Sequence, residues 1–292
     1  MRRIPGTITA EDAVKMTFIH KNLGWRLGLF AALVAISPAV SAQSSEETDT
    51  PPPGPIVTDR PTHSASPVLV PPRTFQLEAG YKFSRNEDGS DSTDAQVLPN
   101  ILARYGINQA VEARLVAAGL NIKRSADGKT TGFSDISLGA KIALADESGA
   151  RPQMALLVGA SLPVGHSDFT SEYVIPKILF LGANSLSDRL GLTYNVGPSF
   201  VTEKSHGGSD THIDLNYAVA LSGSIGGVFS LFGEFYGDFS FGTNRLDNHG
   251  FQAGTTILLS PLFQIDIRAG IGQSENENGW LVGAGLAFRV PH

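Results

Sequence analysis

Apolar and polar residues alternate one by one along most of the chain after residue 74. The first such stretch, residues 75–84, reads FQLEAGYKFS, with an aromatic or aliphatic side chain at every second position. Successive side chains of a β-strand point to opposite faces of a sheet, so each stretch predicts a strand with one apolar and one polar face. The same alternation returns up to residue 290, and a helical repeat of about 3.6 residues fits these windows less well.

These stretches, separated by turn-forming residues, predict an all-β fold of about twelve strands. Short separators such as residues 225–227 alternate with longer, more polar ones such as residues 85–93 and 123–132. Tight turns at one rim and longer loops at the other, with an even strand number, are typical of a transmembrane antiparallel up-and-down β-barrel. The strands are expected at residues 74–84, 94–105, 110–122, 133–145, 153–164, 173–183, 189–202, 211–224, 228–240, 249–260, 262–272 and 279–290.

Backbone pairing in lipid favours a closed barrel over an open sheet. An unpaired N–H or C=O group in hydrocarbon is costly, so a membrane-spanning sheet cannot leave an edge. The apolar face would then contact lipid, and the polar face would enclose a lumen. A soluble exported β-sandwich also consists of short alternating strands and is the alternative fold. Aromatic residues near the predicted strand ends would form interfacial girdles: Phe75, Tyr81, Phe83, Tyr105, Phe229, Phe239, Phe263, Trp280 and Phe288.

The polar face of the predicted strands repeatedly carries ionisable side chains. Two interpretations are open: cross-strand ion pairs that hold the strand register, or a charged lining that selects solutes. Barrels of about 8 strands are filled by side chains and those of about 16–18 leave an aqueous channel, so about twelve strands predict a narrow pore. The candidate pore-lining residues are Glu78, Lys82, Arg104, Glu112, Arg114, Asp135, Lys141, Asp214, Glu234, Asp238, Asp266, Arg268 and Arg289.

The first 73 residues lack this alternation and divide into two parts. Residues 27–36 form one short apolar run, preceded by Lys21 and Arg26 and followed by the small residues of Val40-Ser41-Ala42. This pattern predicts a cleaved signal peptide over residues 1–42, with Met16 as an alternative start. Residues 43–73 are Pro-rich and polar, which predicts an irregular N-terminal segment, either a tether or a plug of the lumen, ahead of the barrel at residues 74–290.

Composition and charge exclude several classes of protein. The chain has no cysteine, which removes disulfides, thiolate nucleophiles and Cys-ligated metals. The net charge of −6 argues against a nucleic-acid partner. For the exported barrel that the strand pattern predicts, the expected partners are outer-membrane lipid, a small-molecule solute and the outer-membrane assembly machinery, with no cofactor and no metal. The pattern does not fix an oligomeric state.

Catalytic motifs are absent from the sequence, and we expect the protein not to be an enzyme. It contains no G-x-S-x-G elbow, no Walker loop and no H-E-x-x-H motif. His166, Ser167 and Asp168 are consecutive, and neighbours in sequence do not form a proton relay in an ordinary loop. Two alternatives to transport stay open: a lipid hydrolase using His166 with Ser161 or Ser167, and a structural or adhesive barrel.

Several motifs resemble one bacterial outer-membrane family. They are TDRP at residues 58–61, FQLEAGY at 75–81, LARYGI at 102–107, GFSDISLGAK at 132–141 and ASLPVG at 160–165. Together they are similar to the family labelled "MetA-pathway of phenol degradation", over roughly residues 57–290. The resemblance implies a barrel of about twelve strands in the outer membrane of a Gram-negative bacterium, reached through the cleaved signal peptide, that passes small compounds, including hydrophobic or aromatic ones.

Two positions depart from that family pattern. Val164-Gly165-His166 stands where the family usually has Thr-Gly-Asp, and the chain ends in Phe288-Arg289-Val290-Pro291-His292, without a terminal aromatic residue. Phe288 is the nearest candidate for the terminal aromatic that outer-membrane assembly prefers. The sequence as a whole predicts a porin-like barrel for passive transport of small solutes.

Overall fold

The computed structural model describes residues 54–88, 91–205, 208–242, 247–274 and 278–290. Residues 1–42, predicted as a signal peptide, and residues 43–53 of the Pro-rich segment lie outside the described residues. Within the described residues, no helix has the length and apolar character that a membrane crossing requires.

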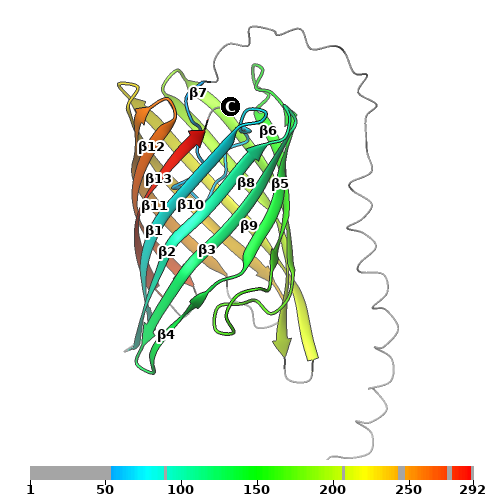
Figure 1. The fold of residues 1–292 in the computed structure, drawn as a ribbon, viewed down its shortest axis with the longest axis vertical. Coiled ribbons are helices and arrows are strands. Elements are labelled where there is room, and N and C mark those ends of the chain that lie inside the picture. Colours follow the sequence, from blue (N-terminus) through cyan, green and yellow to red (C-terminus); the bar gives the residue numbers. More distant parts are fainter. Residues whose placement is uncertain (1–53, 89–90, 206–207, 243–246, 275–277, 291–292) are drawn as a thin grey trace, which may run out of the picture. The chain divides into compact units, whose positions relative to one another are not determined.

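The described residues from 75 onward form one antiparallel sheet that closes on itself (Figure 1). Apart from β4, which pairs with β3 alone, the strands pair in sequence order, and the first strand pairs with the last through the register Phe75↔Val290 to Glu87↔Asn278. The strands are β1 Phe75–Asp88, β2 Asp91–Gly106, β3 Val111–Ser125, β4 Gly128–Phe133, β5 Ile136–Ala145, β6 Gln153–Leu162, β7 Ile175–Ser187, β8 Leu190–Ser205, β9 Gly208–Ile225, β10 Phe229–Phe241, β11 Asn248–Ser260, β12 Phe263–Ser274 and β13 Asn278–Val290.

Two of these thirteen strands, β4 and β5, share one place in the barrel wall. β4 pairs with the second half of β3, from Leu120 to Ser125, and β5 pairs with the first half, from Val111 to Ala117. Counting them as one interrupted strand leaves twelve, so the prediction of a closed twelve-stranded antiparallel barrel is confirmed.

Several segments that the sequence predicts as loops are extensions of the sheet. The described parts of residues 85–93, 123–132 and 203–210 continue the strand ladders to Asp88↔Asp91, Ser125↔Gly128 and Ser205↔Gly208. Beyond the lipid, water solvates both faces of a strand, so the backbone ladder persists where the apolar alternation has ended. The reverse holds between β6 and β7, where residues 163–174 form a longer loop than predicted.

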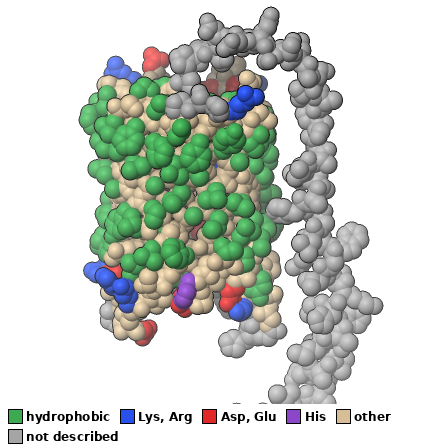
Figure 2. Space-filling model, in the orientation of Figure 1, with side chains coloured by type: hydrophobic (Ala, Val, Ile, Leu, Met, Phe, Trp, Pro, Cys, Tyr) green, Lys and Arg blue, Asp and Glu red, His purple; other side chains and the backbone are tan. Residues whose placement is uncertain are grey.

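Large apolar side chains cover the outside of the barrel. Along β13, Trp280, Val282, Ala284 and Leu286 are exposed, while the residues between them face inward. Figure 2 shows hydrophobic side chains over the middle of the visible face, with charged side chains gathered at its two ends. An apolar belt of this kind is expected to contact lipid. The β-sandwich alternative is therefore wrong, because the apolar faces point outward and do not pack against a second layer.

The two rims of the barrel differ. We call the rim that bears Phe75 and Val290 the terminal rim, and the opposite one, which bears residues 163–174, the loop rim.

The interior between the two rims is polar and closely filled at one level: Gln76, Glu78, Glu112, Lys141 and Gln252 are all inaccessible to solvent. Buried charges need partners, and the partners come largely from the chain ahead of β1.

Candidate functional site in the barrel lumen

Residues 54–74, here called the lumen segment, lie inside the barrel and are held at the terminal rim at both ends. Near its start, the amide of Ile56 donates to the carbonyl of Pro261, at 2.8 Å, in the turn between β11 and β12. Near its end, the amide of Arg73 donates to the carbonyl of Gly106, at 2.6 Å, at the end of β2. The segment therefore enters and leaves through the same rim.

Side chains of the barrel wall bind the backbone of the lumen segment. Glu78 of β1 accepts from the amides of Asp59, at 3.0 Å, and Arg60, at 2.8 Å. Glu234 of β10 accepts from the amides of residues 63 and 64, at 2.7 and 2.6 Å. Asn195 of β8 and Glu112 of β3 accept from the amides of residues 65 and 70. An irregular buried backbone needs such acceptors, because it makes no ladder of its own.

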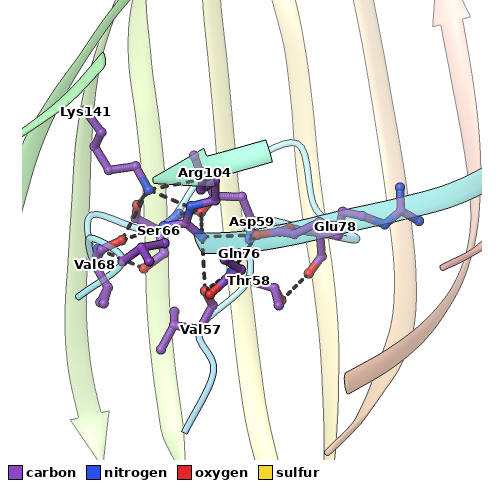
Figure 3. A network of polar contacts seen from close by, with 12 residues as sticks. Val57, Thr58, Asp59, Ser66, Val68, Gln76, Glu78, Arg104 and Lys141 are labelled. Carbon is purple, nitrogen blue, oxygen red and sulfur yellow. Dashed lines mark hydrogen bonds and ion pairs between the residues drawn. The ribbon is translucent and has the colours of Figure 1, made fainter. Parts of the chain in front are cut away.

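A group of three cations surrounds one carboxylate of the lumen segment. Asp59 lies 2.6 Å from Arg114, 3.2 Å from Lys141 and 3.7 Å from Arg104. Arg104 also contacts Glu78, at 3.1 Å, and Glu112, at 2.9 Å. We call these six residues the Asp59 cluster; most of it is drawn in Figure 3.

Charge in the Asp59 cluster balances only when the lumen segment is present. The wall contributes three cations against two carboxylates, Glu78 and Glu112, and Asp59 supplies the third negative charge. Burial alone would raise the pKa of Asp59, but Arg104, Lys141 and Arg114 outweigh it and hold that pKa well below its usual range. Lys141 and Arg104 also donate to segment carbonyls, including that of Val68.

A second ion pair fixes the neighbouring residue of the segment. Arg60 lies 3.1 Å from Asp266 of β12, and both side chains are largely buried. Its guanidinium lies against Gly80 of β1 and Gly285 of β13, which pair directly with each other. A Cβ atom at either glycine would collide with Arg60. Glycine is favoured there because the segment and the backbone carbonyls of the neighbouring strand, at Ala284 and Ala79, both approach closely.

Most of the predicted pore-lining residues contact the lumen segment or its cluster. Arg268 donates to the carbonyl of Pro61 and Arg289 to that of Gly54. The members of the candidate set that the structure brings to the segment or its cluster are Glu78, Arg104, Glu112, Arg114, Lys141, Glu234, Asp266, Arg268 and Arg289.

The other four candidates lie elsewhere. Lys82 and Asp238 line an open cavity. Asp214 accepts from the hydroxyl of Ser240. Asp135 lies between β4 and β5, and its carboxylate accepts from the amides of Gly165 and Ser171, so it holds the loop of residues 163–174.

The residues considered for lipid hydrolysis do not form a catalytic arrangement. Nδ1 of His166 lies 3.3 Å from Asp168, and both side chains are more than half exposed. Within the described residues, no serine hydroxyl is hydrogen-bonded to His166, so the geometry contains no nucleophile–base pair.

Sequence reasoning missed the segment's own contribution to this site. Asp59 and Arg60 belong to the TDRP motif, but nothing in that motif alone shows which wall residues they meet. Neutral inward residues such as Gln76, Asn195 and Gln252 were also missed, although they occupy the polar register positions of their strands. Inward position combined with an amide side chain is the signal that would have found them.

Open space remains on both sides of the lumen segment. A cavity of about 580 Å³, the outer cavity, is lined by Lys82, Asn86, Asp238 and Asn248, which lie toward the loop rim, and by His63 of the segment. A smaller cavity of about 220 Å³ is lined by Ser222, Ser230 and Thr256 toward the terminal rim, and by segment residues including Thr58 and Ser64. The segment separates these two spaces.

A family model described as "Putative MetA-pathway of phenol degradation" matches residues 58–290. The chain belongs to this family. The resemblance seen in the sequence motifs is thereby confirmed. The match of the MetA phenol-degradation family begins one residue before Asp59, so its pattern includes most of the lumen segment as well as the barrel.

Several solved structures are similar to this chain. The COG4313 outer membrane channel from Pseudomonas putida F1 has a TM-score of 0.61 at 12% identity, covering 76% of this chain and 97% of its own. The translocator domain of the autotransporter NalP from Neisseria meningitidis has a TM-score of 0.49 at 11% identity, covering 74% and 88%. The CymD monoaromatic hydrocarbon channel has a TM-score of 0.42 at 10% identity, covering 76% and 89%. No match was found among curated proteins.

Proposed function

We propose that this protein is a porin-like outer-membrane channel for passive transport of small solutes, and that its lumen segment is a plug that must move before solutes cross. The observation that carries the proposal is the pair of cavities separated by residues 54–74. The family assignment and the likeness to an outer membrane channel agree with it. The thirteen candidate residues would then line the opened pore, with most of them holding the plug when it is closed.

Polar contacts suit the lumen segment to a reversible role. It is held by many ion pairs and hydrogen bonds to wall side chains, and it also buries the apolar side chains of Ile56, Ala65 and Val70. Ala65 and Leu69 pack near Leu181. Water can replace hydrogen bonds to the wall at modest net cost, because each contributes only about 0.5–1.5 kcal/mol net, or about 1.5–3 kcal/mol when charged. The hydrophobic cluster that the plug would open on leaving is small: Ala65 and Leu69 of the segment pack with Ala155, Leu157, Leu179 and Leu181 of the wall.

Export and orientation follow from the same proposal. Residues 1–42 would be removed as a signal peptide, the barrel would be inserted by the outer-membrane assembly machinery, and the terminal rim would face the periplasm, from which the chain arrives. Sequencing the N-terminus of the protein purified from outer membranes tests the cleavage after Ala42. We propose no catalytic activity.

Conductance across planar lipid bilayers tests the channel proposal. The wild-type chain is expected to give low conductance, and a variant lacking residues 54–73 a larger and steadier one. Heat-dependent mobility on gels verifies that each variant is folded. Absence of conductance and of solute flux in the folded deletion variant would overturn the proposal; the Asp59→Asn variant described in the Discussion provides a milder opening.

A further inference from the structure

The lining of the outer cavity carries more positive than negative charge, and carboxylates outside the lining, Asp214 for Lys177 and Glu234 for Arg268, act on it only from beyond ion-pair distance. The lining contains the cations Lys82, Lys177 and Arg268 and one carboxylate, Asp238. None of the three cations has a carboxylate within ion-pair distance among the described residues. The nearby Asp266 is taken by Arg60. This differs from the Asp59 cluster, where three cations meet three carboxylates.

Hydrogen-bonding capacity on these cations is also unused. Within the described residues, the ammonium group of Lys82 has no hydrogen-bond partner, and that of Lys177 has one, Oδ1 of Asn216 at 2.9 Å. Arg268 directs Nη1 to the lumen segment and to Gln252, but its Nε is buried without a partner. The ammonium groups of Lys82 and Lys177 are half-buried and face the open cavity, so their unused donors are available to a ligand there. A carboxylate is the kind of ligand with which such charged donors form strong hydrogen bonds.

The remaining lining suits a compact organic body. Tyr236 stacks on His63 with ring centroids 3.7 Å apart and planes 14° apart, which gives the cavity a flat side against the lumen segment. Leu179 and Leu281 add apolar surface, and amide side chains, among them Asn100, add further donors and acceptors. A volume of about 580 Å³ lies within the range usual for small-molecule sites, about 300–1,000 Å³.

We propose that the outer cavity is a binding site for a small organic carboxylate, with Lys82 and Arg268 holding the carboxylate group and Lys177 adding a third positive charge. The proposal rests on the channel function and names its solute class: anionic carboxylates in preference to neutral hydrocarbons. The wall residues of the Asp59 cluster would add to this preference for anions once the plug has moved. When Asp59 leaves with the segment, Arg104, Arg114 and Lys141 face only Glu78 and Glu112.

Calorimetric titration of the purified full chain in lipid nanodiscs tests the site without requiring conduction. Benzoate, benzyl alcohol and benzylamine share a ring and differ in charge. We expect benzoate to bind, and the alcohol and the amine to bind at least on the order of tenfold more weakly. Lys82→Gln is the variant of choice, because Lys82 holds no other described residue, and it should weaken benzoate binding on the order of tenfold.

Lys129→Gln is the matched control, since Lys129 is exposed on β4 near the loop rim and outside the cavity; it should bind benzoate as the wild type does. Equal affinity for benzoate and benzyl alcohol, or unchanged benzoate binding in Lys82→Gln, would overturn the carboxylate site. Bilayer recordings on the same samples separate the two proposals. Benzoate binding without any conductance contradicts the channel, whereas conductance without benzoate binding contradicts the site.

Discussion

Gly80 of β1 and Gly285 of β13 lie directly opposite each other, and the guanidinium of Arg60 occupies the space that their missing Cβ atoms leave. The barrel wall is thus shaped to accept one side chain of the lumen segment. The same side chain then reaches Asp266, so close approach and charge pairing act on a single residue.

Filling that space should loosen the lumen segment. We expect Gly285→Ala to displace Arg60 and raise the exposure of the segment, because the added methyl group overlaps the guanidinium more closely than it does the Ala79 carbonyl of β1. The chain has no cysteine, so a single Ser64→Cys reporter makes this measurable with a maleimide reagent. Ser64 is only 2% exposed and its hydroxyl has no hydrogen-bond partner, so the reporter itself removes no bond.

Gly223→Ala is the control for this experiment. Gly223 lies on β9, where a Cβ atom would meet only ordinary contacts beyond 3.4 Å. Labelling of the Ser64→Cys reporter should rise several-fold in Gly285→Ala and stay at the wild-type rate in Gly223→Ala. Equal rates in both glycine variants would contradict the role assigned to Arg60.

Removing the charge of Asp59 should release the segment more strongly. Asp59→Asn keeps the shape of the side chain but leaves three cations facing two carboxylates. Breaking a buried pair by neutralising one partner costs about 3–5 kcal/mol. We expect higher conductance and faster reporter labelling, while Asp127→Asn, in an exposed turn, changes neither. An Asp59→Asn protein as closed as the wild type would show that the Asp59 cluster does not hold the plug.

Lowering the pH should weaken the binding of the lumen segment to the barrel wall, because His63 takes up a proton when the segment is released. Burial, followed by the charges of Arg268, Lys82 and Lys177, lowers the pKa of docked His63 to about 3, whereas a released histidine has a pKa of about 6.5. The released state therefore binds more protons between these values, and docking weakens by up to about tenfold per pH unit below about 6.5. Asp59, whose docked pKa is lowered, adds its own loss only below about pH 4.

His63→Gln separates these two contributions. Conductance recorded between pH 7 and pH 5 should increase for the wild type and stay level for His63→Gln, which cannot take up the proton. Below pH 4 both proteins should open further as Asp59 is protonated. An equal increase in both proteins between pH 7 and pH 5 would exclude His63 as the cause.

A charged side chain on the outer, apolar face of the barrel should lower the stability of the protein. Ile267 of β12 is 57% exposed on the apolar belt, and its neighbour Arg268 faces the lumen. Arginine on the lipid face of a barrel near the bilayer midplane costs about 2–4 kcal/mol. Ile267→Arg is therefore expected to lower the free energy of unfolding from lipid vesicles by that amount, while Ile267→Leu leaves it nearly unchanged. Equal stabilities would place this face in water.

The strands were predictable from sequence because alternation is a local signal. In stretches such as residues 279–290, the alternation alone shows which side chains belong to the outer face and which to the inner face of the strand. The closed barrel then follows from the need to pair every backbone group in lipid. Strand extensions such as those ending at Asp88 and Ser205 were not predictable, since in water neither face needs to be apolar.

Only the barrel-wall part of the candidate site could be predicted from the sequence. Inward charges such as Glu78 and Lys141 follow from strand parity, but their partner Asp59 lies in an irregular segment with no periodicity. Which wall residues it meets depends on contacts across 82 positions of sequence, as between Asp59 and Lys141. The unpaired state of Lys82 likewise depends on three-dimensional spacing.

The two anchors of residues 54–74 at one rim have a topological consequence. Because the Ile56 and Arg73 amides both bond to the terminal rim, the segment is a folded-back loop and is not threaded through the ring. The loop of residues 56–73 can withdraw toward that rim, with Thr74 as the point where it joins β1. The strands can thus close around water first and receive the loop afterwards, so insertion into the membrane and sealing of the passage are separable events.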